Sequence, residues 1–149
     1  MRVLFVCLGN ICRSPMAHGL FAHRVAERGL TDRLACDSAG TGGWHVGETP
    51  DPRTLATLRR HGISLSHRAR QVVPEDFECF DLLLAMDGNN HETLLSRAPR
   101  SARDRVRRML EPIGGGDVAD PYYGGPDGFE TNFAQLDRAV AAWIEELTR

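Results

Sequence analysis

The chain has 149 residues, a length typical of one domain, so we expect a single domain over residues 1–149. Hydrophobic residues make up 42% and charged residues 26%, which argues against a disordered, collagen-like or coiled-coil protein. The 18 basic and 20 acidic residues give a net charge of −2 and are spread along the chain, so no nucleic-acid partner is expected.

Hydrophobic periodicity, capping residues and glycine-rich turns divide the chain into alternating strands and helices. In chain order the expected elements are a strand over Arg2–Val6, a helix from Ser14 (its N-cap) to near Gly29, a strand over Leu34–Ser38, a loop over Ala39–Gly47, a helix from Asp51 to Gly62, a helical turn at Pro74, a strand over Asp81–Met86, a helix over Asp87–Ser96, an edge strand over Val106–Leu110 and a long amphipathic helix over Phe129–Leu147.

This alternation predicts an α/β domain of three layers, with a central parallel sheet of about four strands and helices on both faces. The continuous apolar run at Asp81–Met86 is typical of a central strand that is covered on both faces. Ligands of such domains bind at the carboxyl ends of the strands, so the loops that follow the strands are the candidate site.

Neither a membrane span nor a metal centre is expected. No apolar run exceeds six residues, against the roughly 18 that a span requires, and no secretory signal precedes the first strand. The four cysteines are scattered and form no C-x2-C pair, which favours a reducing cytoplasm and disfavours both a disulfide framework and a metal site. We therefore expect a cytoplasmic protein without metal or cofactor, monomeric or weakly self-associating; the sequence leaves open export by a non-classical route.

The segment from Cys7 to Arg13 carries the strongest chemical signal, because it joins the first strand to the first helix. Backbone N–H groups and a helix N-terminus at such a turn attract an anion, and Gly9 and Asn10 tolerate the positive φ that a tight loop requires. Arg13 can add a bidentate contact to phosphate. The positive loop favours the thiolate form of Cys7, a nucleophile whose sulfur Ser14 can stabilise by a hydrogen bond.

Two segments of the sequence resemble the signatures of a known family. The segment Val6–Pro15 (VCLGNICRSP) is similar to the phosphate-binding loop of the low-molecular-weight protein tyrosine phosphatases, and Asp120–Tyr123 (DPYY) resembles their second signature. Asp37–His45 and Leu84–Asp87 look like the family's active-site rim and the end of its third strand, so the likeness covers nearly the whole chain.

The resemblance implies a role for each matched residue. Cys7 is the nucleophile that forms a phosphocysteine, Arg13 binds the phosphate, and Asp120 is the general acid and then the general base. The remaining roles fall into three sets: phosphate binding by Leu8, Gly9, Asn10, Ile11, Cys12, Arg13 and Ser14; loop support by Asn10, Ser14 and Ser38; and the sides of a slot for an aryl phosphate by Trp44, Tyr122 and Tyr123. Phosphotyrosine proteins are the implied substrates, and the two tyrosines can themselves be phosphorylated in the family.

Structural explanations compete with several of these roles. Asp120 precedes a proline and is equally typical of a turn, and Trp44 is equally typical of a packing residue. Asp87 is interpreted chiefly as a structural or loop-supporting residue, since an Asp at the end of a strand often caps the following helix, and His67 is interpreted as an ordinary polar residue. Cys12 lies in the same loop as Cys7, so we predict a protective Cys7–Cys12 disulfide, against the alternative that Cys12 is buried filler.

Three other activities compete with this one. Arsenate reductase needs further cysteines after the third strand, and the sequence has none after Cys79. A phosphocarrier must avoid hydrolysis, whereas Arg13 and Asp120 favour turnover. Protein-arginine phosphatase is the nearer alternative. The apolar Ile11 and the aromatic Trp44 favour phosphotyrosine over phosphoarginine.

Overall fold

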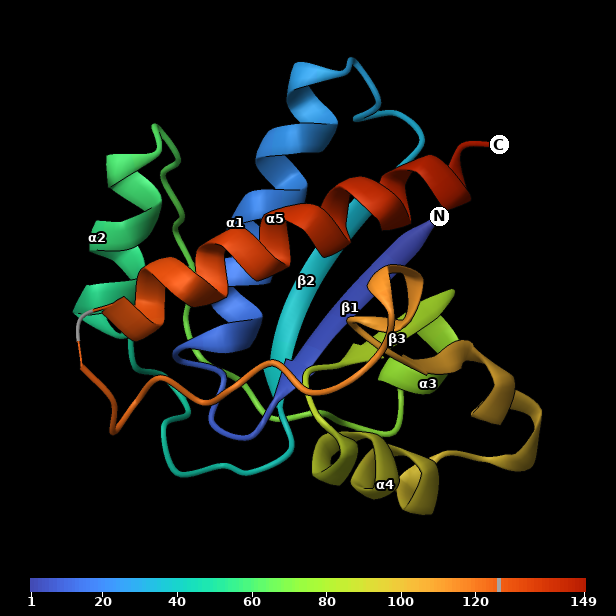
Figure 1. The fold of residues 1–149 in the computed structure, drawn as a ribbon. Helices are drawn as coiled ribbons and strands as arrows, with labels where there is room; N and C mark the ends of the chain where they lie inside the picture. The colour runs from blue at the N-terminus through green and yellow to red at the C-terminus, as the bar shows by residue number, and fades with distance from the viewer. Residues whose placement is uncertain (126) are drawn as a thin grey trace.

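The computed structural model describes residues 1–125 and 127–149, and its described part contains one four-stranded sheet (Figure 1). All neighbouring strands pair in parallel, in the order β2-β1-β3-β4, over β1 (Arg2–Cys7), β2 (Ala35–Gly40), β3 (Leu82–Ala85) and β4 (Val106–Arg108). The expected α/β class with about four parallel strands is therefore confirmed.

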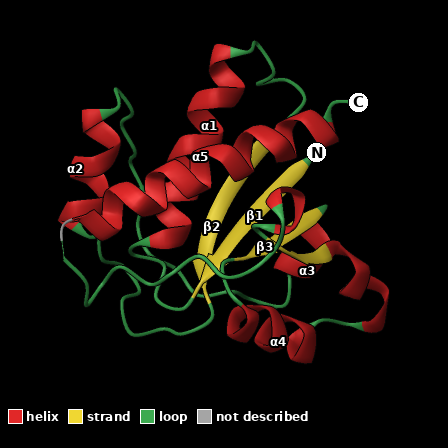
Figure 2. Cartoon of the chain, in the orientation of Figure 1, coloured by secondary structure: helices red, strands yellow, loops and turns green. Residues whose placement is uncertain are grey.

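Helices cover both faces of the sheet (Figures 1 and 2). They are α1 (Arg13–Glu27), α2 (Pro52–Arg60), α3 (Asp76–Cys79), α4 (Gly88–Arg97) and α5 (Asp127–Leu147), with 3₁₀-helical turns at Arg100–Arg105 and Glu111–Ile113. One face packs under α1, α2 and α5, where Phe5 meets Phe21 edge-on and Trp143 is fully buried. The other face packs under α3 and α4, through Phe77 and Leu94.

Most boundaries differ from the predicted ones by one or two residues. Helix α1 begins at Arg13, so the prediction of Ser14 as its N-cap is wrong: Cys12 takes that place without a side-chain cap, and the Ser14 hydroxyl contacts Cys7 instead. Strand β2 continues to Gly40, into the expected loop, because it pairs with β1 as far as Cys7. Strand β4 ends at Arg108, two residues early, since Leu110 already leads into a 3₁₀ turn.

The parallel arrangement places the carboxyl ends of β1, β2 and β3 at one edge of the sheet. Cys7, Gly40 and Met86 lie at or just after these ends. The backbone at Leu8 approaches Gly40 so closely that no side chain fits there: a Cβ on Gly40 would lie 2.7 Å from the Leu8 carbonyl oxygen. Within the described residues, none of the helices is both long enough and apolar enough to span a membrane.

Candidate active site

The loop between β1 and α1 owes its shape to Asn10, which has φ +58 and is the one non-glycine residue with positive φ in the described part of the chain. The left-handed conformation is costly for most side chains, so it needs compensation. Here the Asn10 side chain is fully buried, and its Oδ1 accepts hydrogen bonds from His67 Nε2 at 2.9 Å and from the Arg70 backbone N–H at 3.0 Å. Its Nδ2 donates to Ser14 Oγ at 2.8 Å.

The Cys7 sulfur lies inside this loop. The Asn10 backbone N–H donates to Cys7 Sγ at 3.3 Å, and Ser14 Oγ lies 3.0 Å from the same sulfur. Since Ser14 Oγ already accepts from Asn10, its own proton is free to point at the sulfur. Both contacts, together with the N-terminus of α1, stabilise a negative sulfur.

Arg13 is buried beside Cys7 and is held from the far side of the site. One of its nitrogens, Nη1, donates to Asp87 Oδ2 at 2.7 Å and to the Val118 carbonyl oxygen at 3.0 Å. Burial alone would lower the pKa of Arg13, but the negative charges of Cys7 and Asp87 outweigh it and raise that pKa above its ordinary value. The guanidinium is therefore a permanent cation at the loop.

A cavity of about 310 Å³ opens over the loop. Its lining comes from three separate segments: Cys7, Leu8, Gly9, Ile11, Cys12, Arg13, Trp44, His45, Asp120, Tyr122 and Tyr123. The sequence assigned a site role to each of these residues except His45, which it included only as the last residue of the rim segment Asp37–His45. The described structure thus brings together segments more than 100 positions apart in the chain.

Asp120 enters the cavity from the loop that precedes α5. Its Oδ1 accepts from the Tyr122 backbone N–H at 3.1 Å, and its Oδ2 lies 3.8 Å from Arg13 Nη2. The two alternatives for Asp120 are therefore compatible, because one oxygen organises a turn while the carboxylate faces the loop. Trp44 is 73% exposed, which argues against a packing role for its side chain.

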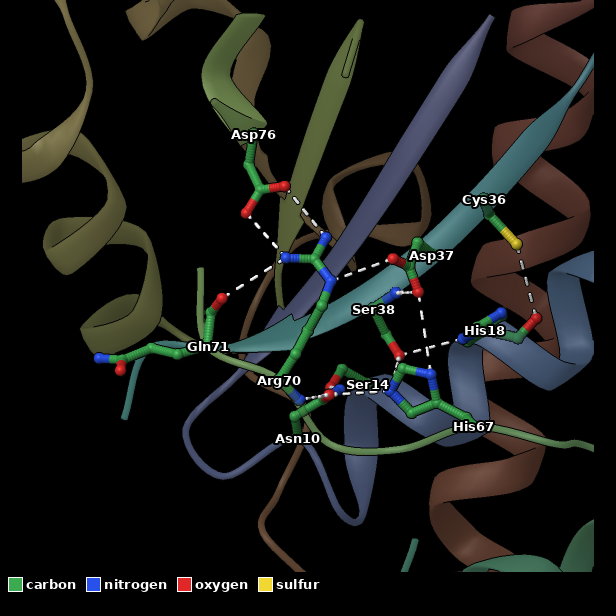
Figure 3. Close-up of polar contacts among 10 residues, drawn as sticks. All are labelled: Asn10, Ser14, His18, Cys36, Asp37, Ser38, His67, Arg70, Gln71 and Asp76. Atoms are coloured by element: carbon green, nitrogen blue, oxygen red, sulfur yellow. Dashed lines mark hydrogen bonds and ion pairs between the residues drawn. The ribbon is translucent and has the colours of Figure 1, made fainter. Parts of the chain in front are cut away.

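None of the three predicted support residues lines the cavity. Asn10 and Ser14 contact Cys7 directly, as described above, whereas Ser38 reaches the loop through His67. Its hydroxyl lies 3.2 Å from His67 Nε2 and 3.0 Å from His18 Nδ1 (Figure 3).

Sequence reasoning gave no specific role to His67 or His45, and it named Asp87 as structural or loop-supporting without its partner Arg13. His67 was interpreted as an ordinary polar residue, yet it fixes Asn10; no spacing in the sequence links position 67 to the loop. Asp87 caps α4 as predicted, accepting from the Asn90 backbone N–H at 2.7 Å, and in addition holds Arg13. His45 lines the cavity, with Nδ1 at 2.8 Å from Glu48 Oε2.

Cys12 lies in the same loop as Cys7 and lines the same cavity. Burial, followed by the nearby Asp51 carboxylate, raises the pKa of Cys12 to about 12. The residue is therefore a neutral thiol at physiological pH, and a neutral thiol is a poor nucleophile. Its pairing with Cys7 on oxidation stays a prediction.

Comparison with known proteins places this site in a family. Residues 2–149 match the family model described as low molecular weight phosphotyrosine protein phosphatase. A low molecular weight protein-tyrosine-phosphatase of Streptomyces coelicolor is 49% identical over 144 residues, covering 93% of this chain and 88% of that protein. The chain belongs to the low molecular weight phosphotyrosine protein phosphatase family.

Solved structures agree with this assignment. A protein tyrosine phosphatase of Entamoeba histolytica superposes with a TM-score of 0.96 at 38% identity, covering 99% of this chain and 97% of that one. A Drosophila arginine phosphatase superposes with a TM-score of 0.92 at 33% identity, covering 100% and 99%. The chain is thus an enzyme of the protein-tyrosine-phosphatase class, on a fold that also carries arginine phosphatases.

Proposed function

We propose that the chain hydrolyses phosphotyrosine in proteins through a phosphocysteine on Cys7, with Asp120 as general acid and base, and that residues 1–149 act as one phosphatase domain. One observation carries the proposal: Cys7, Arg13 and Asp120 line the same cavity. Within it a phosphate can meet a nucleophile, a fixed cation and a proton donor at the same time, which are the parts that phosphoryl transfer requires.

In the first step the Cys7 thiolate attacks phosphorus while the bond from phosphorus to the tyrosine oxygen breaks. Arg13 and the loop amides bind the non-bridging oxygens, where negative charge is concentrated. The protonated Asp120 gives its proton to the departing phenolate, so tyrosine leaves neutral. The products are tyrosine and a phosphocysteine.

In the second step Asp120, now a carboxylate, takes a proton from water as that water attacks phosphorus. The bond from phosphorus to sulfur breaks, inorganic phosphate leaves, and Cys7 returns as a thiolate that the Asn10 N–H and Ser14 hydroxyl stabilise. Arg13 and the amides supply the positive charge that a metal supplies in other phosphatases, so we expect turnover to persist in a chelator such as EDTA.

The sides of the cavity favour a flat, long substrate group. Trp44 and Tyr122 stand at its edge, so an aryl phosphate reaches Cys7 while a phosphoserine side chain is too short. Tyr123, 92% exposed, packs edge-on against Tyr122 at 4.8 Å between ring centroids and extends the same rim. Ile11 offers phosphoarginine no hydrogen-bond partner. The family resemblance to a Drosophila arginine phosphatase nevertheless makes that substrate the necessary competitor.

Steady-state kinetics on three peptides of one sequence, carrying phosphotyrosine, phosphoserine or phosphoarginine, test the proposal. We expect the highest kcat/KM for phosphotyrosine and almost no turnover of phosphoserine. A value for phosphoarginine equal to or above that for phosphotyrosine would move the protein to the arginine-specific branch and overturn our interpretation of Ile11 and Trp44.

A further inference from the structure

Two histidines and an aspartate from three separate elements meet behind the phosphate-binding loop. His18 comes from α1, Asp37 from β2 and His67 from the segment after α2 (Figure 3). Each offers one ligand atom, and these atoms all lie within 4.8 Å of one another. The imidazole rings meet edge-on, with their centroids 5.1 Å apart.

We propose that His18, Asp37 and His67 form a binding site for one divalent transition-metal ion of the zinc type, separate from the catalytic cavity. Two imidazoles and one carboxylate are a ligand set that zinc uses in proteins, with a fourth position left for water. Because the three ligands come from distant parts of the chain, the spacing patterns that identify metal sites in a sequence do not reveal this one.

The chemical state of the cluster suits a metal. Burial, followed by the neighbouring His67, lowers the pKa of His18 to about 4, and burial also lowers the pKa of His67. Both rings are therefore neutral at physiological pH, the form in which imidazole binds metals. Asp37 adds the negative charge, and its side chain, 35% exposed, gives the site a route to solvent.

The contacts of His67 indicate which of its nitrogens binds. Nδ1 lies 3.8 Å from Asp37 Oδ1, whereas Nε2 faces Asn10 Oδ1 at 2.9 Å. A metal on Nδ1 forces the proton onto Nε2, and that N–H then donates to Asn10. This is the arrangement in which an outer partner orients a metal-bound histidine. An ion at this site therefore strengthens the contact that holds Asn10 in its left-handed conformation.

Binding requires a small contraction. Zinc bonds of about 2.1 Å in tetrahedral geometry place ligand atoms about 3.4 Å apart. The ligand atoms must therefore move roughly an ångström toward one another, by rotation of their side chains. The positive charge of Arg70, which repels a metal ion, is close to the site, since its Nε lies 3.1 Å from Asp37 Oδ2. Two further hydrogen bonds of 3.0 Å join Arg70 to Asp76, so its charge stays paired when Asp37 turns toward a metal.

Calorimetry with Zn²⁺ alone, in a buffer without phosphate or chelator, measures the site in the Cys7→Ser protein, which lacks the reactive thiolate. We expect one ion per chain and a Tm that rises with Zn²⁺ concentration. The His18→Ala substitution should weaken binding at least about 10-fold, the smallest loss that removal of even an outer partner of a metal ligand usually causes. The matched control is His23→Ala, on the same helix but paired with Glu27 outside the cluster; it should bind as tightly as its parent.

Co²⁺ supplies a second readout that does not depend on activity. We expect visible d–d absorption without a thiolate-to-cobalt charge-transfer band, and its loss in Asp37→Asn, which keeps the shape of the side chain. A thiolate band, equal binding by His18→Ala and its parent, or an unchanged Tm in Zn²⁺ would each overturn the proposal. The Tm of each variant without metal establishes that it is folded.

Discussion

Two segments face each other across the cavity, and they are held very differently. The Cys7–Arg13 loop is tied from several directions: Asn10 is fully buried and Arg13 is 4% exposed, with partners at His67, Arg70 and Asp87. The facing segment, residues 119–125, is held by fewer described bonds. The Asp120 side chain is 45% exposed. Arg53 Nη2 donates to the Tyr122 carbonyl oxygen, and Asn132 Nδ2 donates to the Ala119 carbonyl oxygen.

The difference separates two tasks. In the proposed mechanism, the side that binds phosphate and stabilises a thiolate is organised before substrate arrives, so its groups lose little entropy in the reaction. The side to which we assign proton transfer has room to admit a protein substrate and release tyrosine. Substitutions of the residues that hold the first segment in place, such as Asn10, are therefore expected to damage folding and chemistry together, and substitutions in the second segment to damage chemistry alone.

The largest effect is expected for Cys7→Ser, which removes the proposed nucleophile and leaves the loop in place. Turnover should fall by at least about 10⁴-fold, whereas phosphate and vanadate should still bind, because Arg13 and the loop amides need no sulfur. Stopped assays and equilibrium binding measure the two quantities separately. Substantial residual turnover would rule out the phosphocysteine.

Asp120→Asn should follow, with turnover of phosphotyrosine lowered by about 10² to 10⁴ and a smaller loss on an activated phenyl phosphate, whose leaving group needs no proton. Thermal unfolding should be nearly unchanged, because the carboxylate is half-exposed. Asp117→Asn is the control, since Asp117 pairs with Arg108 outside the cavity. Equal losses of Asp120→Asn on both substrates would indicate a purely structural role.

Asn10 tests the rigid segment. Asn10→Gly keeps the freedom for positive φ but loses the side-chain hydrogen bonds, and Asn10→Ala loses both. We therefore expect kcat to fall about 10- to 100-fold in each variant. The free energy of unfolding should fall by about 1 kcal/mol more in the alanine variant than in the glycine variant.

Gly124→Ala is the matched change in the exposed segment. It should change the free energy of unfolding by less than about 0.5 kcal/mol, because the added Cβ only reaches ordinary contact, 3.6 Å from the Pro121 carbonyl oxygen. Urea unfolding and steady-state kinetics of the three variants decide whether the two segments differ as stated.

The smallest effect is expected at the rim. Trp44→Ala removes an exposed aromatic contact worth about 0.5 to 1.5 kcal/mol, so KM for phosphotyrosine peptides should rise about 2- to 10-fold with kcat little changed. Val46→Ala, an exposed residue of the same loop that does not line the cavity, should leave KM unchanged. A fall in kcat with constant KM would move Trp44 from substrate binding to the chemical step.

The sequence predicted the architecture because period and capping are local properties. Asp51 and Asp87 cap α2 and α4 as their positions indicate, and the buried run of β3 is apolar throughout. Spacing within one turn likewise placed Cys7, Arg13 and Ser14 together. The supports from far along the chain were beyond its reach: no local pattern shows that His67 and the Arg70 backbone bind Asn10, or that the cap of α4 also holds Arg13.

The same long-range supports set the order in which the enzyme becomes competent during synthesis. Residues 7 to 13 are made early, but Asn10 finds its partners only after residues 67 and 70 have been added, and Arg13 only after Asp87 and Val118. A nascent chain therefore contains Cys7 long before its loop has all of its partners. During refolding, the recovery of activity is accordingly expected to follow the completion of tertiary structure and not the early formation of β1 and α1.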